Sequence, residues 1–182
     1  LGRGVGRIVD GTEAMRLVAH ALDPSIEEMK IVAAAKSRRR RFELALTQIE
    51  PEVLSALDHL RVAGIKTALV SDAGADDLDG WTQSPLRTRL DAAVFSYPIG
   101  IRKPDARIYW HALDALGVSP QDALFVGDGG SDEHRGAKSV GMTAVLVTRM
   151  LEKYWPEKLS ERRRHADHEF VDVPKLVHSL AI

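Results

Sequence analysis

The chain has 182 residues, of which 45% are hydrophobic and 28% are charged, so it can form one domain, or one domain with a small insert. A formal net charge of -1 and a pI near 6.7 give no reason to expect nucleic acid or an anionic membrane as a partner. No cysteine is present and no apolar run approaches the roughly 18 residues of a membrane-spanning helix, so disulfides and thiolate chemistry are excluded and a cytoplasmic protein is expected.

The first third of the chain is predicted to be helical. Thr12 is a candidate N-cap for a helix through Leu22, which Asp23-Pro24 would end. Apolar residues then recur at helical spacing from Ser25 to about Gln48, which predicts a helical hairpin. A third helix is expected to begin at Pro51 and to end at Gly64.

From Ile65 onward, short apolar runs alternate with helical stretches, which is the pattern of βαβ units. The fold class predicted is therefore α/β, with a parallel, Rossmann-like sheet and flanking helices. Residues 1–50 are expected to form a small all-helical segment and residues 51–182 the α/β core. The expected strands are Thr67–Val70, Ala92–Phe95, Ala123–Val126, Thr143–Val147 and, more weakly, His168–Val171; the expected helices are Asp105–Leu116, Asp132–Val140 and one around Leu151–Arg164.

Two candidate phosphate-binding positions follow the first half of this pattern. Ser71 and Asp72 come directly after the strand ending at Val70, where a hydroxyl and backbone N–H groups can hold a phosphate oxygen. An ordinary strand-to-helix turn would have the same Ser-Asp-Ala-Gly sequence. Lys103 stands just before a helix that starts near Pro104, free to reach into a cleft. Taken alone, it reads better as a solvated surface lysine.

Three carboxylates follow the strand that ends at Val126. Asp128 lies at the carboxyl end of that strand beside two glycines, and Asp132 with Glu133 opens the next helix. Clustered carboxylate oxygens suit Mg²⁺. Asp132 and Glu133 alone can also be explained by the positive end of a helix, but that explanation does not account for Asp128.

In this order, Ser71, Lys103-Pro104 and Gly127-Asp128 with the acids that follow resemble the haloacid dehalogenase superfamily, from roughly Pro51 to Met142. The resemblance implies a Mg²⁺-dependent phosphatase that works through an aspartyl-phosphate. It implies that Ser71 binds the phosphoryl group, that Lys103 holds nucleophile and phosphate together, and that Asp128 ligates the metal. The second metal-side acid is Glu133 or Asp132, with Glu133 favoured by counting back from Gly141. The helical hairpin Asp10–Ile49 resembles the family's substrate-selecting cap.

The first motif of the family, an apolar strand followed by Asp-x-Asp-Gly-Thr, is not intact. Ile8 stands where the nucleophile should be, and Asp10-Gly11-Thr12 reads best as the turn and cap that lead into the first helix. In the family's sheet this strand lies between those that carry Ser71 and Asp128. We therefore expect a strand and nucleophile to lie upstream of Leu1; a pseudoenzyme and a chain completed by a partner are the alternatives.

The function expected for the complete protein is hydrolysis of a small phosphorylated metabolite, with no nucleic acid or membrane partner. Two alternatives stay open: a carbon–halogen hydrolase of the same family, which needs no metal, and a non-catalytic pseudophosphatase or binding protein. The acids at Asp132 and Glu133, and Asp72 where dehalogenases tend to have asparagine, argue against the dehalogenase. The basic run Lys36–Arg41 is expected to form a solvated cap surface; recruitment of an anionic substrate or nucleic acid is the alternative. Neither substrate identity nor oligomeric state follows from the sequence.

Overall fold

The computed structural model describes residues 10–180, which divide into two compact units. The first unit contains the described residues up to Ile49 together with Ser71–Thr88 and Phe95–Arg102. The second contains Glu50–Val70, Arg89–Val94 and Lys103 to the end of the described chain. The division near residue 50 follows the end of the expected helical segment, but two short segments of the expected core group with the first unit.

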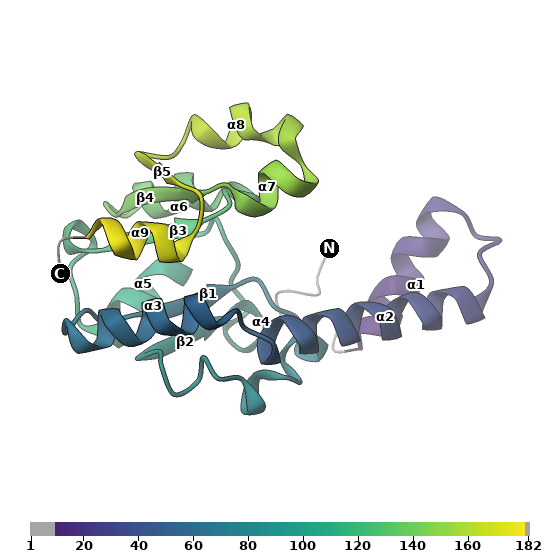
Figure 1. Ribbon diagram of the computed structural model, residues 1–182. Helices are drawn as coiled ribbons and strands as arrows, with labels where there is room; N and C mark the ends of the chain where they lie inside the picture. Colours follow the sequence, from purple (N-terminus) through teal and green to yellow (C-terminus); the bar gives the residue numbers. More distant parts are fainter. Residues whose placement is uncertain (1–9, 181–182) are drawn as a thin grey trace. The chain divides into compact units, whose positions relative to one another are not determined.

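Two antiparallel helices, α1 (Gly11–Leu22) and α2 (Glu28–Thr47), form the predicted hairpin of the first unit (Figure 1). The N-cap of α1 is Asp10, not Thr12, because the Asp10 carboxylate accepts a hydrogen bond from the Thr12 backbone N–H at 2.8 Å. Asp10-Gly11-Thr12 thus forms the cap of α1, as expected. The unit also contains one short helix that was not predicted, α4 (Ser96–Ile99).

The second unit holds the β-strands, most of them at the predicted positions. Three adjacent strands run parallel in the order β3-β4-β5, with Val126 paired to Val145 and Val145 to His168. The parallel α/β prediction is therefore confirmed. The bounds are β1 (Ala68–Ser71), β2 (Ala92–Phe95), β3 (Leu124–Gly127), β4 (Thr143–Val147), β5 (His168–Phe170), α3 (Pro51–Val62), α5 (Ala106–Leu116), α6 (Glu133–Ser139), α7 (Arg149–Tyr154), α8 (Leu159–Arg163) and α9 (Val173–Ser179).

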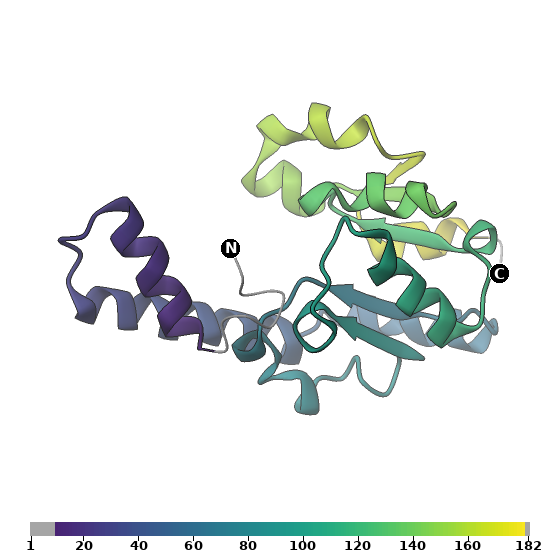
Figure 2. The ribbon, with the colours of Figure 1, turned by 180° about the vertical axis from the view of Figure 1, so that it is seen from behind.

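Helices cover both faces of the three-stranded sheet. Figures 1 and 2, taken from opposite sides, show α6 on one face and α9 on the other. The middle strand β4 is accordingly the most buried, with Ala144, Val145 and Leu146 at most 1% exposed. This double covering explains why its sequence is a continuous apolar run.

The strands β1 and β2 form a separate two-stranded sheet. Among residues 10–180, no ladder joins β1 to β3. No residue of β1 is buried although three of its four are apolar, and Leu124 of β3 is 46% exposed. The family's first strand is expected between β1 and β3. Ile8, which stands at the expected nucleophile position, lies outside the described residues.

The prediction of one helix around Leu151–Arg164 is wrong, because the structure has two helices there. The helix α7 ends at Tyr154 and α8 begins at Leu159, with Trp155-Pro156 between them. Proline lacks a backbone N–H and restricts the residue before it, here Trp155 at φ -146° and ψ 54°. The C-terminal α9 was not predicted. In the described part of the chain, no helix has the length and apolar character needed to span a membrane.

Candidate functional site

The loop after β3 has an unusual backbone that places Asp128 at the carboxyl end of the strand. Gly129 has a φ of 77°, and two residues with side chains, Ser131 and Asp132, have φ values of 54° and 53°. Left-handed backbone of this kind is uncommon outside glycine. Within the loop, the Asp128 carboxylate accepts a hydrogen bond from the Gly130 N–H at 2.7 Å.

Lys103 and Glu133 form a largely buried ion pair beside this loop. The Lys103 Nζ lies 2.7 Å from Glu133 Oε2, and the two side chains are 13% and 6% exposed. The other carboxylate oxygen, Oε1, accepts the Gly129 N–H at 2.9 Å. Glu133 therefore connects the lysine to the backbone of the Asp128 loop, and Lys103 is not a solvated surface residue.

Gly127 makes the position of the Glu133 carboxylate possible, because it has no side chain. A Cβ atom placed on Gly127 would lie 2.1 Å from Glu133 Oε1, so any other residue would displace the carboxylate. Tyr109 fixes the same region from α5, because its hydroxyl donates to the Glu133 backbone oxygen at 2.8 Å. Two elements, the end of β3 and the helix α5, thus set the position of the acid.

The two candidate second acids differ in their surroundings. Glu133 is buried and paired with Lys103, whereas the Asp132 side chain is 50% exposed and pairs with Arg135 on the next turn at 2.8 Å. These surroundings favour Glu133, the acid preferred from the spacing to Gly141. The assignment of either acid to a metal stays a prediction.

Ser71 is the last residue of β1 and Asp72 follows it; both belong to the first compact unit, in a turn that ends at Gly74. Ser96, fully buried, donates its hydroxyl to the Ala73 oxygen at 3.1 Å. The Gly74 N–H donates to an Asp77 carboxylate oxygen at 2.9 Å. The turn is therefore held from both sides by side chains that the sequence analysis did not single out.

The structure brings together Lys103, Glu133 and the Asp128 loop, all in the second unit. Ser71 and Asp72 lie in the other unit, so their placement against Lys103 stays a prediction. Asp128 and Glu133 offer the hard oxygen donors that Mg²⁺ prefers. Within residues 10–180, no group of three or more potential ligand side chains is assembled.

Two residues close to the loop were not among the predicted site residues. His134 is 1% exposed and packs edge-on against Phe125 at 6.3 Å between ring centres. Burial lowers its pKa, although Glu133 and the Gly127 and Val145 backbones act in the opposite direction. Arg162 of α8 donates to the Gly129 backbone oxygen. Its position in a run of arginines gave no signal of this contact.

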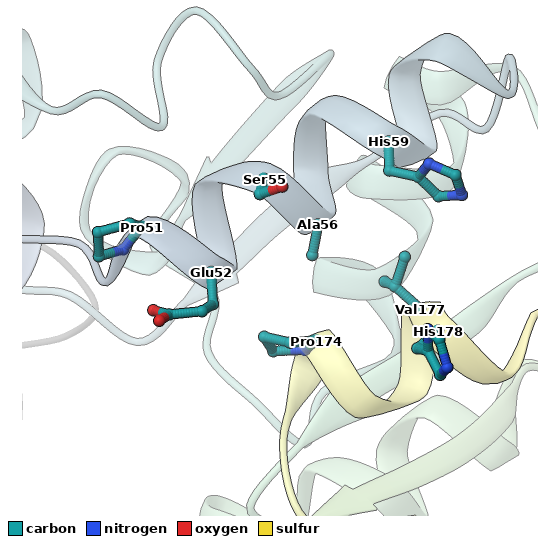
Figure 3. Close-up of a pocket in the computed structure, with 8 residues that line it drawn as sticks. All are labelled: Pro51, Glu52, Ser55, Ala56, His59, Pro174, Val177 and His178. Carbon is teal, nitrogen blue, oxygen red and sulfur yellow. The ribbon is translucent and has the colours of Figure 1, made fainter.

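A groove of about 490 Å³ lies between α3 and α9 (Figure 3). Ala56 of α3 and Val177 of α9 line it with apolar side chains, and His59 and His178 lie at one end. None of the predicted site residues lines it. The groove is therefore separate from the candidate phosphate and metal residues.

The arginine run on α2 is not simply a solvated surface. Arg38 is 19% exposed and forms an ion pair with the buried Asp77. Arg39 pairs with Asp79, and Arg40 with Glu43 on its own helix. Because Asp77 and Asp79 both follow β1, the first two arginines fasten α2 to the segment that carries Ser71.

Comparisons with known proteins agree with these motifs. A family model described as haloacid dehalogenase-like hydrolase matches residues 7–141. A glyceraldehyde 3-phosphate phosphatase of Methanopyrus kandleri is 32% identical over 67% of this chain and 53% of its own length. An (S)-2-haloacid dehalogenase of a Pseudomonas species is 28% identical over 89% of this chain and 71% of its own.

Among solved structures, a HAD phosphatase from Thermococcus onnurineus superimposes with a TM-score of 0.61 and 28% identity. The alignment covers 73% of this chain and 58% of that one. The chain spans about half the length of curated phosphatases that it matches. The similarity thus covers most of this chain but only part of each phosphatase.

Proposed function

Since this chain belongs to the haloacid dehalogenase-like hydrolase family, we propose that it carries the phosphate- and metal-binding residues of a Mg²⁺-dependent phosphatase for a small phosphorylated metabolite. The aspartate nucleophile of that enzyme comes from a segment outside residues 1–182. Ser71 and Asp72 bind the phosphoryl group, Lys103 holds it against the nucleophile, and Asp128 with Glu133 holds the metal.

The observation that supports the proposal best is the Lys103–Glu133 pair. A lysine at 2.7 Å from a buried carboxylate keeps its ammonium group in one place beside the Asp128 loop. Such a fixed cation can balance charge on a phosphate without reorganising during the reaction. A solvated lysine on a flexible stem would lose side-chain entropy for the same contact.

In the proposed reaction, each of the site residues has a separate role. The Ser71 hydroxyl donates a hydrogen bond to a phosphoryl oxygen, and the Lys103 ammonium stabilises the negative charge shared by phosphate and nucleophile. Asp128 and Glu133 would hold Mg²⁺, which would supply further positive charge to the phosphoryl group when bound. Glu133 accepts hydrogen bonds from the Lys103 ammonium and the Gly129 N–H, and so holds the lysine beside the loop that carries Asp128.

A carbon–halogen hydrolase is the second candidate, because the Pseudomonas dehalogenase aligns with 89% of this chain. That reaction needs no metal, whereas three carboxylates follow β3 here. Asp72 also stands where dehalogenases tend to have asparagine. These residues favour the phosphatase.

The test is an assay of the protein at its natural length on a panel of phosphomonoesters and on 2-chloropropionate. Phosphate release that needs Mg²⁺ and stops with EDTA is expected. Lys103→Met and Asp128→Asn should each lower kcat by at least about 100-fold, because the first removes the cation that stabilises the reacting phosphate and the second removes a carboxylate that holds the metal. Halide release that is insensitive to EDTA would favour the dehalogenase instead.

Two exposed residues serve as controls for these variants. Lys66→Met removes a surface lysine, and Asp114→Asn removes a surface carboxylate from α5. Both should retain the activity of the unmodified protein. Activity that survives Lys103→Met and Asp128→Asn equally well would rule out the assigned roles.

A further inference from the structure

The turn that follows β1 depends on one buried carboxylate. Asp77 is 2% exposed, and its Oδ2 atom accepts the Gly74 backbone N–H at 2.9 Å. Gly74 ends the turn that begins with Ser71 and Asp72. The orientation of the turn's backbone therefore depends on where the Asp77 carboxylate is held.

The group that holds Asp77 comes from the cap. Arg38 of α2 forms a two-pronged ion pair with it: Nη1 bonds Oδ1, and Nη2 bonds Oδ2 at 3.1 Å. The Arg38 guanidinium also lies over the Phe42 ring, 4.2 Å from its centre. A planar guanidinium fixes a carboxylate in one orientation, which an ammonium cannot do as well.

A second pair, next to the first, lacks this connection. Arg39 pairs with Asp79 at 2.5 Å, but the two side chains are 63% and 40% exposed. Exposed pairs of this kind contribute little to stability. Arg39 therefore provides a matched comparison. It is the neighbouring residue on the same helix and has the same chemistry, but its ion pair is with Asp79 and not with Asp77.

We propose that Arg38 is a positioning residue that holds the Ser71–Gly74 turn through Asp77, so that the cap helix α2 and the phosphate-binding turn act as one body. The phosphate part of this inference rests on the proposed function. The chain of contacts from Arg38 through Asp77 to the Gly74 N–H does not. Removing Arg38 takes away the guanidinium that holds both oxygens of the buried Asp77 carboxylate, so the carboxylate can move and its bond to Gly74 weakens.

Backbone amide exchange of the 182-residue chain, followed by NMR, tests the contact directly. In Arg38→Met, the Gly74 amide should exchange at least about tenfold faster, because its acceptor is released. Arg38→Lys should give a smaller increase, and Arg39→Met should leave the rate unchanged. The double variant Arg38→Met/Asp77→Asn should return the rate toward that of the unmodified chain, since the amide oxygen of the new side chain can accept the same bond without a buried charge.

Titration with inorganic phosphate in the presence of Mg²⁺ tests the consequence for binding. Shifts of the Ser71 and Asp72 amides report binding at the turn. Arg38→Met should weaken this binding by about tenfold through the displaced backbone donors, and Arg39→Met should not weaken it.

Two results would overturn the inference. One is an unchanged Gly74 exchange rate in Arg38→Met. The other is an equal increase in amide exchange rate throughout α2 and residues 71–88, seen in Arg38→Met and also in the double variant. That result would mean that Arg38 only stabilises the first unit as a whole. If the unmodified chain bound no phosphate, the proposed phosphate site would be rejected, while the Gly74 exchange rate would still decide whether Arg38 positions the turn.

Discussion

Lys103 and Glu133 stabilise each other, so removing one of them should destabilise the fold as well as the site. In Lys103→Met, the Glu133 carboxylate stays buried without its cation, and we expect the free energy of unfolding to fall by about 3 kcal/mol. Urea unfolding at pH 7 measures this loss. The exposed-site variant Lys66→Met should change the same quantity by less than about 0.5 kcal/mol.

The cost lies in the unpaired charge, which a double variant can demonstrate. Lys103→Met/Glu133→Gln removes both charges and keeps an oxygen that can accept the Gly129 N–H. It should recover at least half of the stability lost in Lys103→Met, since neutral replacements of a buried pair are often tolerated. A stability loss in the double variant equal to the sum of the losses in Lys103→Met and Glu133→Gln would contradict this explanation.

At the residue scale, the sequence selects candidate side chains but does not predict how they are arranged. Asp128 was selected by its position at a strand end, and Lys103 by its position just before a helix. The difference between Asp132 and Glu133 depends on the two left-handed residues before α6, and no sequence pattern predicts left-handed backbone at a serine and an aspartate. The burial of His134 depends on packing against Phe125, which lies nine positions earlier in the chain.

At the scale of secondary structure, Asp167 joins three elements. Its carboxylate accepts the Lys138 ammonium of α6 at 2.5 Å and the Ala144 N–H of β4 at 2.9 Å, and it stands just before β5. The Lys138 bond, followed by the Ala144 bond, lowers the pKa of Asp167 below its ordinary value of 3.8. Because the ionised form is favoured in the folded chain, it contributes stability at neutral pH.

This contribution should disappear in acid. It is complete above pH 3.8 and is lost as the pH falls through the lower pKa of the folded chain. Asp167→Asn should lower the free energy of unfolding at pH 7 by only about 1 kcal/mol, since the side chain is 34% exposed and solvent screens the pair. Urea unfolding of both proteins between pH 7 and 3 should show the difference shrinking; a constant difference would exclude the ionised carboxylate as its source.

Elements were predictable where apolar periodicity was strong and unpredictable where tertiary packing decided. The runs Thr143–Val147 and Ala106–Leu116 have clear patterns, and the structure has β4 and α5 there. The stretch Leu151–Arg164 has helix-forming residues on both sides of Pro156, and the proline decided its division. The short α9 is stabilised by packing against α3 and by its Asp172 cap, which accepts the Lys175 N–H.

At the scale of the whole molecule, the second unit has two sheets with apolar edge strands. In an all-parallel sheet, strands are normally covered on both faces and paired on both sides. Here no residue of β1 is buried, Leu124 of β3 is 46% exposed, and no described ladder joins the two strands. Such edges can accept another strand.

We therefore expect a peptide with an apolar strand of about five residues, followed by Asp-x-Asp-Gly-Thr, to stabilise this chain. At 100 times its dissociation constant, such a ligand raises the free energy of unfolding by about 2.7 kcal/mol, which a thermal melt detects as a higher Tm. A peptide with both aspartates replaced by asparagine should stabilise equally, because backbone pairing and apolar burial are unchanged, but only the aspartate peptide should support Mg²⁺-dependent phosphate release. A scrambled peptide of the same composition that stabilised the chain as well would show that binding is not strand addition, and the absence of any stabilisation would mean that β1 and β3 do not form an acceptor.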